Sequence, residues 1–157
     1  MGFDLKAYGT LRTEIEDGHG STAAVIHRAV PLGWRAEWDR EAAGLRKSMP
    51  AVPEPPADDA DADALASYME AADGFSAEMA AFERRARDVK VRVFRRLLLD
   101  VVIDFEGVTL NGAEATVAQV VEALAGAGGE YDRGQPLVDL GQAVIDTARI
   151  DPPAEKG

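Results

Sequence analysis

The sequence predicts a mainly α-helical protein, a small helical bundle with one long heptad-patterned helix. Alanine, the strongest helix former, accounts for 28 of the 157 residues. Apolar residues recur at alternating intervals of three and four between Leu65 and Val93, which is the heptad pattern of a long amphipathic helix. The first 20 residues leave open a short strand or hairpin, because Phe3 and Leu5 alternate with polar neighbours.

The first 49 residues are expected to form an N-terminal helical segment. Ser21 and Thr22 are typical helix caps and predict a short helix over Ala23–Ala29. A clearer helix is predicted over Trp34–Lys47, where one apolar stripe contains Trp34, Trp38, Ala42 and Leu45. Both tryptophans lie on that stripe, which suits either a core or a contact surface.

Residues 50–64 are predicted to be an extended linker. Four prolines fall between Pro50 and Pro56, and a run of four aspartates follows between Asp58 and Asp63. Proline breaks a helix because it lacks the amide hydrogen and clashes with the preceding turn. Like charges then keep such a segment extended and solvated.

Residues 65–157 are expected to form a C-terminal helical domain, and its first helix carries the strongest pattern in the chain. The apolar stripe contains Leu65, Tyr68, Ala72, Phe75, Met79, Phe82, Ala86, Val89 and Val93. Gly74 lies off the stripe and could kink or split the helix. From Phe94 the apolar residues crowd onto several faces as far as Phe105, which predicts a buried helix that ends at Gly107.

Two shorter helices are predicted after a turn at Asn111-Gly112, a pair typical of tight turns. Thr116 and Gln119 have the spacing of a capping box and predict a helix over residues 116–125. The last helix is expected to begin near Pro136 and to end before Pro152.

The net charge of −11 disfavours general nucleic-acid binding, because phosphate backbones repel such a surface. The absence of cysteine excludes disulfides and thiolate chemistry. Neither a secretory signal nor an apolar stretch long enough to span a bilayer is found, so a cytoplasmic protein is expected.

No pattern of residues predicts an enzyme, a metal site or a cofactor. Phosphate-binding, dinucleotide-binding and zinc-protease motifs are all missing from the sequence. The two histidines, His19 and His27, are too far apart for a helical ligand pair. A calcium-loop spacing does occur at Asp59, Asp61, Asp63 and Glu70, but alanine stands where the loop requires glycine.

The most specific chemical feature is a basic stripe, the seven basic residues between Arg84 and Arg96. The preferred interpretation is that the stripe is the solvated face of the long helix. The second interpretation is that it binds an acidic protein partner. The candidates for partner binding, taken from this stripe and from the apolar faces, are Trp34, Trp38, Phe75, Met79, Phe82, Arg84, Arg85, Arg92, Phe94, Leu98 and Phe105.

The stretch from Val91 to Val108, followed by Asn111-Gly112 and the helix over residues 116–125, resembles the C-terminal part of tail assembly chaperones of long-tailed bacteriophages. In that family an apolar helix leads to an aromatic-Glu-Gly-Val turn, which here is Phe105-Glu106-Gly107-Val108. Phe105 stands where many relatives have tryptophan. The resemblance covers about the last 65 residues, and the N-terminal third and the linker have no counterpart in it.

The resemblance implies a chaperone that shields the long helices of the tape measure protein and helps to recruit tail-tube subunits. The residues themselves predict a non-enzymatic protein-binding factor, with helical faces that pack on partner helices. Two alternatives remain open. The chain could be a structural or adaptor component of a virion or prophage-like assembly that forms homo-oligomers through the heptad helix, or a small nucleic-acid-binding regulator that uses the basic stripe.

Overall fold

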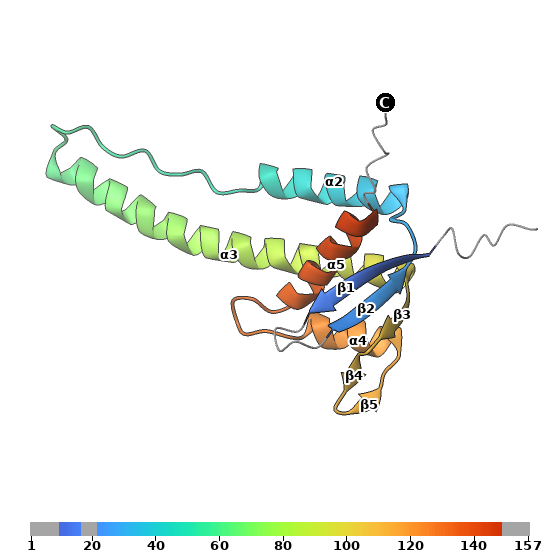
Figure 1. Cartoon of the computed structure of the whole chain (residues 1–157). Helices are drawn as coiled ribbons and strands as arrows, with labels where there is room; N and C mark the ends of the chain where they lie inside the picture. The colour runs from blue at the N-terminus through green and yellow to red at the C-terminus, as the bar shows by residue number, and fades with distance from the viewer. Residues whose placement is uncertain (1–9, 17–21, 149–157) are drawn as a thin grey trace, which may run out of the picture. The chain divides into compact units, whose positions relative to one another are not determined.

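The computed structural model describes residues 10–16 and 22–148 (Figure 1). Helices account for 59% of these residues and strands for 16%. The helical majority was therefore predicted correctly, but a helical bundle is not the whole architecture. Helices α4 and α5 pack against a three-stranded sheet, α5 against β1 and α4 against β3.

The sheet is antiparallel, with the order β1 (Leu11–Glu16), β2 (Thr22–His27) and β3 (Val102–Glu106). Strand β2 is central and pairs along its length with β1, from Leu11 opposite His27 to Glu16 opposite Thr22. It also pairs with β3, where the register shifts between Ile26 and His27. The hairpin expected near the N-terminus thus lies at residues 11–27, whereas Phe3 and Leu5 lie outside the described residues.

The prediction of a helix over Ala23–Ala29 is wrong, because residues 22–27 form strand β2. The two alanines of β2, Ala23 and Ala24, favour a helix when they are considered without their neighbours in space. In the fold, Ala24 and Val25 are buried between two strands, with exposed fractions of 1% and 0%. Pairing on both edges of the strand therefore outweighs the local preference of alanine.

The two long helices are α2 (Leu32–Lys47) and α3 (Ala62–Val101), joined by the proline-rich segment. The helix predicted over Trp34–Lys47 is confirmed. Helix α3 is continuous through Gly74, so this glycine does not split the helix in two. At the start of α3, the Asp61 carboxylate accepts a hydrogen bond of 2.8 Å from the Ala64 amide, which is a helix cap.

Helix α3 ends at Val101, earlier than predicted, and the chain enters β3 at the next residue. A run of apolar, β-branched residues suits a buried helix or a buried strand equally well, and pairing with β2 decides for the strand. The carbonyl of Val101 accepts a hydrogen bond of 2.9 Å from the Arg28 amide at this junction. Gly107 follows β3 and adopts a positive φ of 75°.

The remaining elements follow the sequence signals closely. Strands β4 (Thr109–Leu110) and β5 (Ala113–Glu114) form a hairpin whose turn is Asn111-Gly112, with φ values of 52° and 79°. Thr116 and Gln119 form both bonds of the capping box of α4 (Val117–Ala125). The last helix, α5 (Gln135–Ala148), begins one residue before the predicted proline.

The chain divides into two compact units, residues 1–37 with 90–157, and residues 38–89. The first unit holds the sheet, α4, α5 and most of the buried side chains. The second consists of the C-terminal part of α2, the proline-rich segment and the N-terminal part of α3, where Phe82 is the buried hydrophobic residue.

Trp34 anchors the start of α2 within the first unit. Its indole N–H donates a hydrogen bond of 2.8 Å to the carbonyl of Val93, so the buried ring has no unsatisfied polar atom. The ring meets Phe94 edge to face, with centroids 5.4 Å apart. Phe94 in turn packs on Gly141 of α5, where an added Cβ would lie 2.3 Å from the ring atom Cδ1.

We expect Gly141→Ala to lower the free energy of unfolding by about 1–3 kcal/mol, because the new methyl group forces the Phe94 ring to move. The matched control is Gly74→Ala in α3, where nothing lies within 4 Å of the added Cβ. This change should raise helix stability by about 0.5–1 kcal/mol. Urea unfolding followed by circular dichroism measures both, and equal effects of the two variants would contradict this packing.

Candidate functional site

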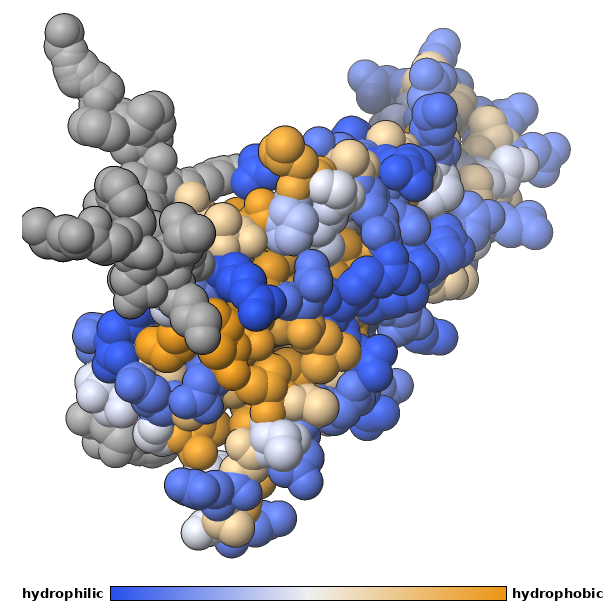
Figure 2. Space-filling model, turned by 90° about the vertical axis from the view of Figure 1, so that its right-hand side faces the viewer, coloured by the Kyte–Doolittle hydropathy of each residue, from blue (hydrophilic) through white to orange (hydrophobic). Residues whose placement is uncertain are grey.

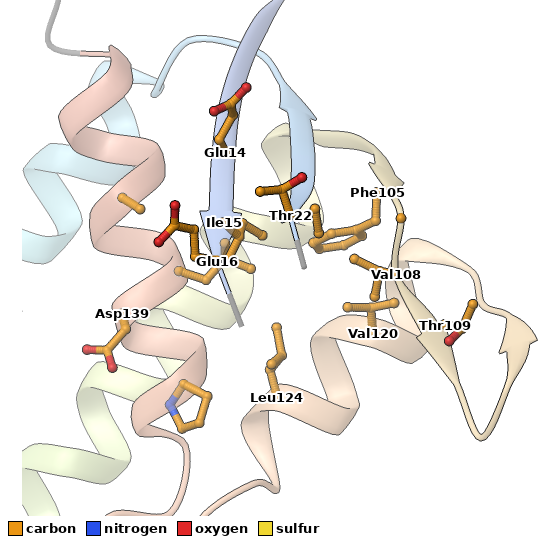
Figure 3. Close-up of a pocket in the computed structure, with 15 residues that line it drawn as sticks. Glu14, Ile15, Glu16, Thr22, Phe105, Val108, Thr109, Val120, Leu124 and Asp139 are labelled. Atoms are coloured by element: carbon orange, nitrogen blue, oxygen red, sulfur yellow. The ribbon is translucent and has the colours of Figure 1, made fainter. Parts of the chain in front are cut away.

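The best-formed site in the described residues is an apolar pocket of about 610 Å³ within the first unit. The C-terminal end of β1 and the N-terminal end of β2 form one side of the pocket. Residues of β3 and of the turn after it, together with α4 and α5, form the other walls (Figure 3). The volume falls in the range of ordinary ligand pockets. Its lining consists of Glu14, Ile15, Glu16, Thr22, Ala23, Phe105, Gly107, Val108, Thr109, Val120, Leu124, Pro136, Asp139, Leu140 and Ala143.

Strand alternation and helix periodicity place the apolar side chains of this pocket. Ile15 and Phe105 belong to the sheet face that α4 and α5 cover, because successive residues of a strand point to opposite faces. Val120 and Leu124 are one turn apart on α4, so their side chains share one face of the helix. Figure 3 shows these four side chains extending from three elements toward a common space.

Gly107 sets the shape of the wall between β3 and β4. Its φ of 75° lies in the left-handed region that favours glycine. An added Cβ would also lie 3.3 Å from the carbonyl oxygen of Thr22, which is closer than most Cβ contacts. This turn brings Val108 to the pocket, where it lies near Val120 in Figure 3.

The charged residues that border the pocket are acidic. Glu14, Glu16 and Asp139 are the charged residues among the lining, and all three are exposed. The Asp139 carboxylate accepts a hydrogen bond of 2.8 Å from the Gln135 side chain on the same helix. No cluster of three residues able to hold a metal ion occurs in the part of the chain that the structure describes. Strand alternation directs the Glu14 and Glu16 side chains to the sheet face opposite Ile15, and the Asp139 carboxylate points away from the apolar side chains in Figure 3, so the walls of the pocket are apolar.

Apolar residues also gather on the molecular surface in Figure 2, where hydrophilic residues surround them. Phe105, Val108 and Leu124 are half-exposed, whereas Val120 and Leu140 are buried, with exposed fractions of 3% and 7%. The pocket is therefore a hollow that opens from solvent onto the core, with no polar floor of its own.

A second cluster, the buried His27, Thr13 and Thr147, lies in the first unit. The imidazole has an exposed fraction of 0%. Its Nδ1–H donates to the carbonyl of Arg28 at 2.8 Å, and Nε2 is hydrogen-bonded to the Thr13 hydroxyl at 2.7 Å. The Thr13 hydroxyl lies 2.8 Å from the Thr147 hydroxyl, which in turn lies 3.0 Å from the carbonyl of Ala143. This chain of bonds ties β1 and β2 to α5 and leaves His27 no access to a substrate.

Thr13→Val should therefore act on stability. It removes the hydroxyl between His27 and Thr147 and leaves a buried ring nitrogen without its partner, which costs about 1–3 kcal/mol. Thr22→Val, at an exposed position of β2, is the matched control and should stay within about 0.5 kcal/mol of the parent protein. Chemical unfolding measures both variants, and a neutral Thr13→Val would show that the hydrogen-bonded chain adds nothing.

The structure divides the apolar candidates for partner binding into three groups. Trp34, Phe94 and Leu98 are core residues, with exposed fractions of 7%, 3% and 0%. In the second unit, Trp38, Phe75 and Met79 are half-buried and Phe82 is buried. Of all the predicted candidates, Phe105 is the one that lines the pocket.

The basic stripe is an exposed helix face with ion pairs at its C-terminal end. Arg95 pairs with Glu122 of α4, and Arg96 forms two bonds of 2.5 and 2.7 Å with Glu37 of α2. Among the candidates, Arg84, Arg85 and Arg92 are exposed, and the Arg85 guanidinium lies 5.6 Å from the centre of the Phe82 ring.

Sequence reasoning missed most of the pocket. The helix over residues 116–125 was predicted, but nothing local to Val120 and Leu124 shows what these side chains meet. Ile15 and Ala23 belong to strands that were not predicted at those positions. An alternation of apolar and polar residues over 11–16 was the available signal for β1.

Comparison with known proteins gives no match to a family model, to a curated protein or to a solved structure. Within the described residues, no helix combines the length and the apolar character that crossing a membrane requires. The pocket is therefore the observation on which a functional assignment has to stand.

The pocket wall can be altered without loss of the fold. Leu124 is half-exposed, so Leu124→Asp should lower the free energy of unfolding by about 1–2 kcal/mol and leave the far-ultraviolet spectrum unchanged. Its neighbour Val121 is fully buried, and Val121→Asp should lose cooperative unfolding because it buries an unpaired charge. Thermal unfolding by circular dichroism separates the two, and equal damage would mean that Leu124 belongs to the core.

Proposed function

We propose that this chain is a non-enzymatic protein-binding factor that acts as a tail assembly chaperone and shields helical segments of a tape measure protein. The apolar pocket is the proposed binding site. The single observation that carries the proposal is an apolar hollow open to solvent, with walls formed by Ile15, Phe105, Val108, Val120 and Leu124. Such a hollow suits the burial of apolar side chains from a partner.

The segment that resembles tail assembly chaperones supports this site. The aromatic-Glu-Gly-Val turn supplies Phe105, Gly107 and Val108 to the lining, and the helix after Asn111-Gly112 supplies Val120 and Leu124. The resemblance and the pocket therefore fall on the same residues. The proposed role is binding to apolar helical ridges while the net charge of −11 keeps the complex in solution.

A second candidate function is a structural or adaptor component that forms homo-oligomers through α3. Its supporting observation is the exposed apolar pair Leu65 and Met69, one helical turn apart, with exposed fractions of 50% and 60%. The rest of the heptad stripe is half-buried or buried within the chain, which leaves less surface for a coiled-coil partner. The pocket is the larger unfilled apolar feature, so the chaperone proposal is preferred.

Co-expression with the candidate helical partner tests the proposal. The parent chain should keep the tape measure protein soluble and co-purify with it, and Leu124→Asp should reduce the recovered complex at least about tenfold, as expected when a central contact costs more than 1.4 kcal/mol. Leu65→Asp, at an exposed apolar position of α3, is the matched control and should leave recovery unchanged.

Two results would contradict the chaperone proposal. One is a tape measure protein that stays soluble when it is expressed without this chain, or a complex that is recovered in equal amounts with the parent chain and with Leu124→Asp. The other is the presence of the chain in purified particles, with Leu65→Asp abolishing its self-association, which would favour the structural component.

A further inference from the structure

We propose that two copies of this chain pair in an antiparallel manner through the outward face of α3, so that the acidic part of one helix lies against the basic part of the other. This face is centred on Ala77, with Glu70 seven residues before it and Arg84 seven residues after it. Seven residues are close to two helical turns, so the three side chains project from one side of the helix. All three residues are exposed. The proposed dimer is independent of the pocket, which lies in the first unit.

The outward face is the side of α3 that points away from the heptad stripe. Of the stripe, Tyr68 and Phe75 are half-buried and Phe82 is buried, so the stripe packs against other parts of the second unit. Each residue turns a helix by about 100°, which places Ala77 on the side opposite these residues. Figure 1 shows α3 as one uninterrupted helix, so no break separates its acidic part from its basic part.

The charges along α3 are sorted by sign. No lysine or arginine occurs between Lys47 and Arg84, whereas Arg84 itself begins the basic stripe. Glu70 and Arg84 are about 21 Å apart along the helix axis, at about 1.5 Å per residue, which is too far for an ion pair within one chain. Glu70, Asp73 and Arg84 form no ion pair with another described residue. Their charges are therefore available to a second molecule.

An antiparallel arrangement of two copies matches the two parts of the helix. A two-fold axis at Ala77 puts Glu70 of one copy opposite Arg84 of the other, and the symmetry repeats the same pair on the other side of the axis. A parallel arrangement would instead put Glu70 beside Glu70 and Arg84 beside Arg84, and like charges oppose such contacts. Asp88 interrupts the basic stripe, and in the antiparallel register it lies opposite the uncharged Ala66.

Small residues in the middle of the face allow the two helices to approach closely. The exposed small residues there are Gly74, Ala77, Ala80 and Ala81. Packed helix axes lie about 8–10 Å apart, and small contact residues favour the shorter distances. Met69, with an exposed fraction of 60%, lies opposite Arg85 of the second copy in this register, so the aliphatic stem of that arginine covers it.

The dimer is expected to be weak. The paired segment, residues 66–88, is about 33 Å long and buries mostly small side chains, which gives less buried area than a standard interface. A small interface between exposed charges forms at high protein concentration and is weakened by salt.

Sedimentation velocity of the full chain over a concentration series tests the pairing. Glu70→Arg with Asp73→Arg, or Arg84→Glu with Arg85→Glu, should weaken self-association at least about tenfold, because each pair of changes places like charges opposite each other. The first pair also makes the chain less acidic, so general repulsion between copies falls and cannot explain the weakening. High salt should weaken the parent dimer and leave the variants less affected.

Two controls separate the register from net charge. The variant that carries both pairs of changes in α3 keeps the net charge of the parent chain and should restore self-association, because the acidic and basic parts have only exchanged places. Glu54→Arg with Asp58→Arg, at exposed positions of the proline-rich segment, changes the net charge as much as the first pair does and should not weaken self-association.

Cysteine crosslinking reports the direction of the two helices. The parent chain has no cysteine, so a single introduced thiol can crosslink only to the same position of a second copy. Ala77→Cys lies at the two-fold axis and should give a disulfide-linked dimer under mild oxidation. Ala66→Cys is the matched control, since it lies on the same face about three turns away, and its two copies would be about 33 Å apart in the antiparallel dimer.

Three results would overturn the antiparallel dimer. The first is a chain that stays monomeric at every concentration. The second is equal crosslinking of Ala77→Cys and Ala66→Cys, which indicates a parallel or unspecific contact. The third is dissociation by Leu65→Asp with no effect of the charge reversals, which assigns self-association to the heptad stripe. Each of these results leaves the proposed binding site in the pocket untouched, because none of the variants alters a residue that lines it.

Discussion

The antiparallel pairing of β2 with β3 is the constraint on which the first unit depends. It joins residues 24–27 to residues 102–106, which are far apart in the chain. The hydrogen bond from the Arg28 amide to the Val101 carbonyl fixes the point at which α3 must end. Without β3, the N-terminal segment would be a two-stranded hairpin, which is marginally stable in water. With β3 in place, the inner face of the sheet becomes a surface on which α4 and α5 can pack.

The pocket follows from that packing. The sheet brings Ile15 and Phe105 to one face, and the helices bring Val120, Leu124 and Leu140 opposite them. The Gly107 turn borders the hollow, and an added Cβ at this position would lie 3.3 Å from the Thr22 carbonyl oxygen. The hollow is therefore bounded by backbone geometry on one side and by core residues on the other.

The sequence predicted those helices and turns that are determined by residues close to one another in the chain. The capping box at Thr116, the Asn111-Gly112 turn and the heptad helix are set by residues within a few turns of one another. The strands β2 and β3 were missed because an alanine-rich segment and a continuous apolar run fit a helix as well as a strand until their partners are known. The site shares this limit. Its lining is drawn from residues 14–16, 22–23, 105–109, 120–124 and 136–143, and the sequence carries no sign that these segments meet.

Binding at the pocket and folding of the first unit are coupled, since they use the same side chains. Val120 and Leu140 line the hollow and also belong to the buried core. An occupant that binds the folded chain alone therefore stabilises it by RT ln(1 + [L]/Kd), about 2.7 kcal/mol at a hundredfold excess over Kd. Conversely, loosening of the β2–β3 pairing would displace Phe105 from the wall and weaken the site. Under the proposed function, a partner that buries this surface therefore also stabilises the fold of the first unit.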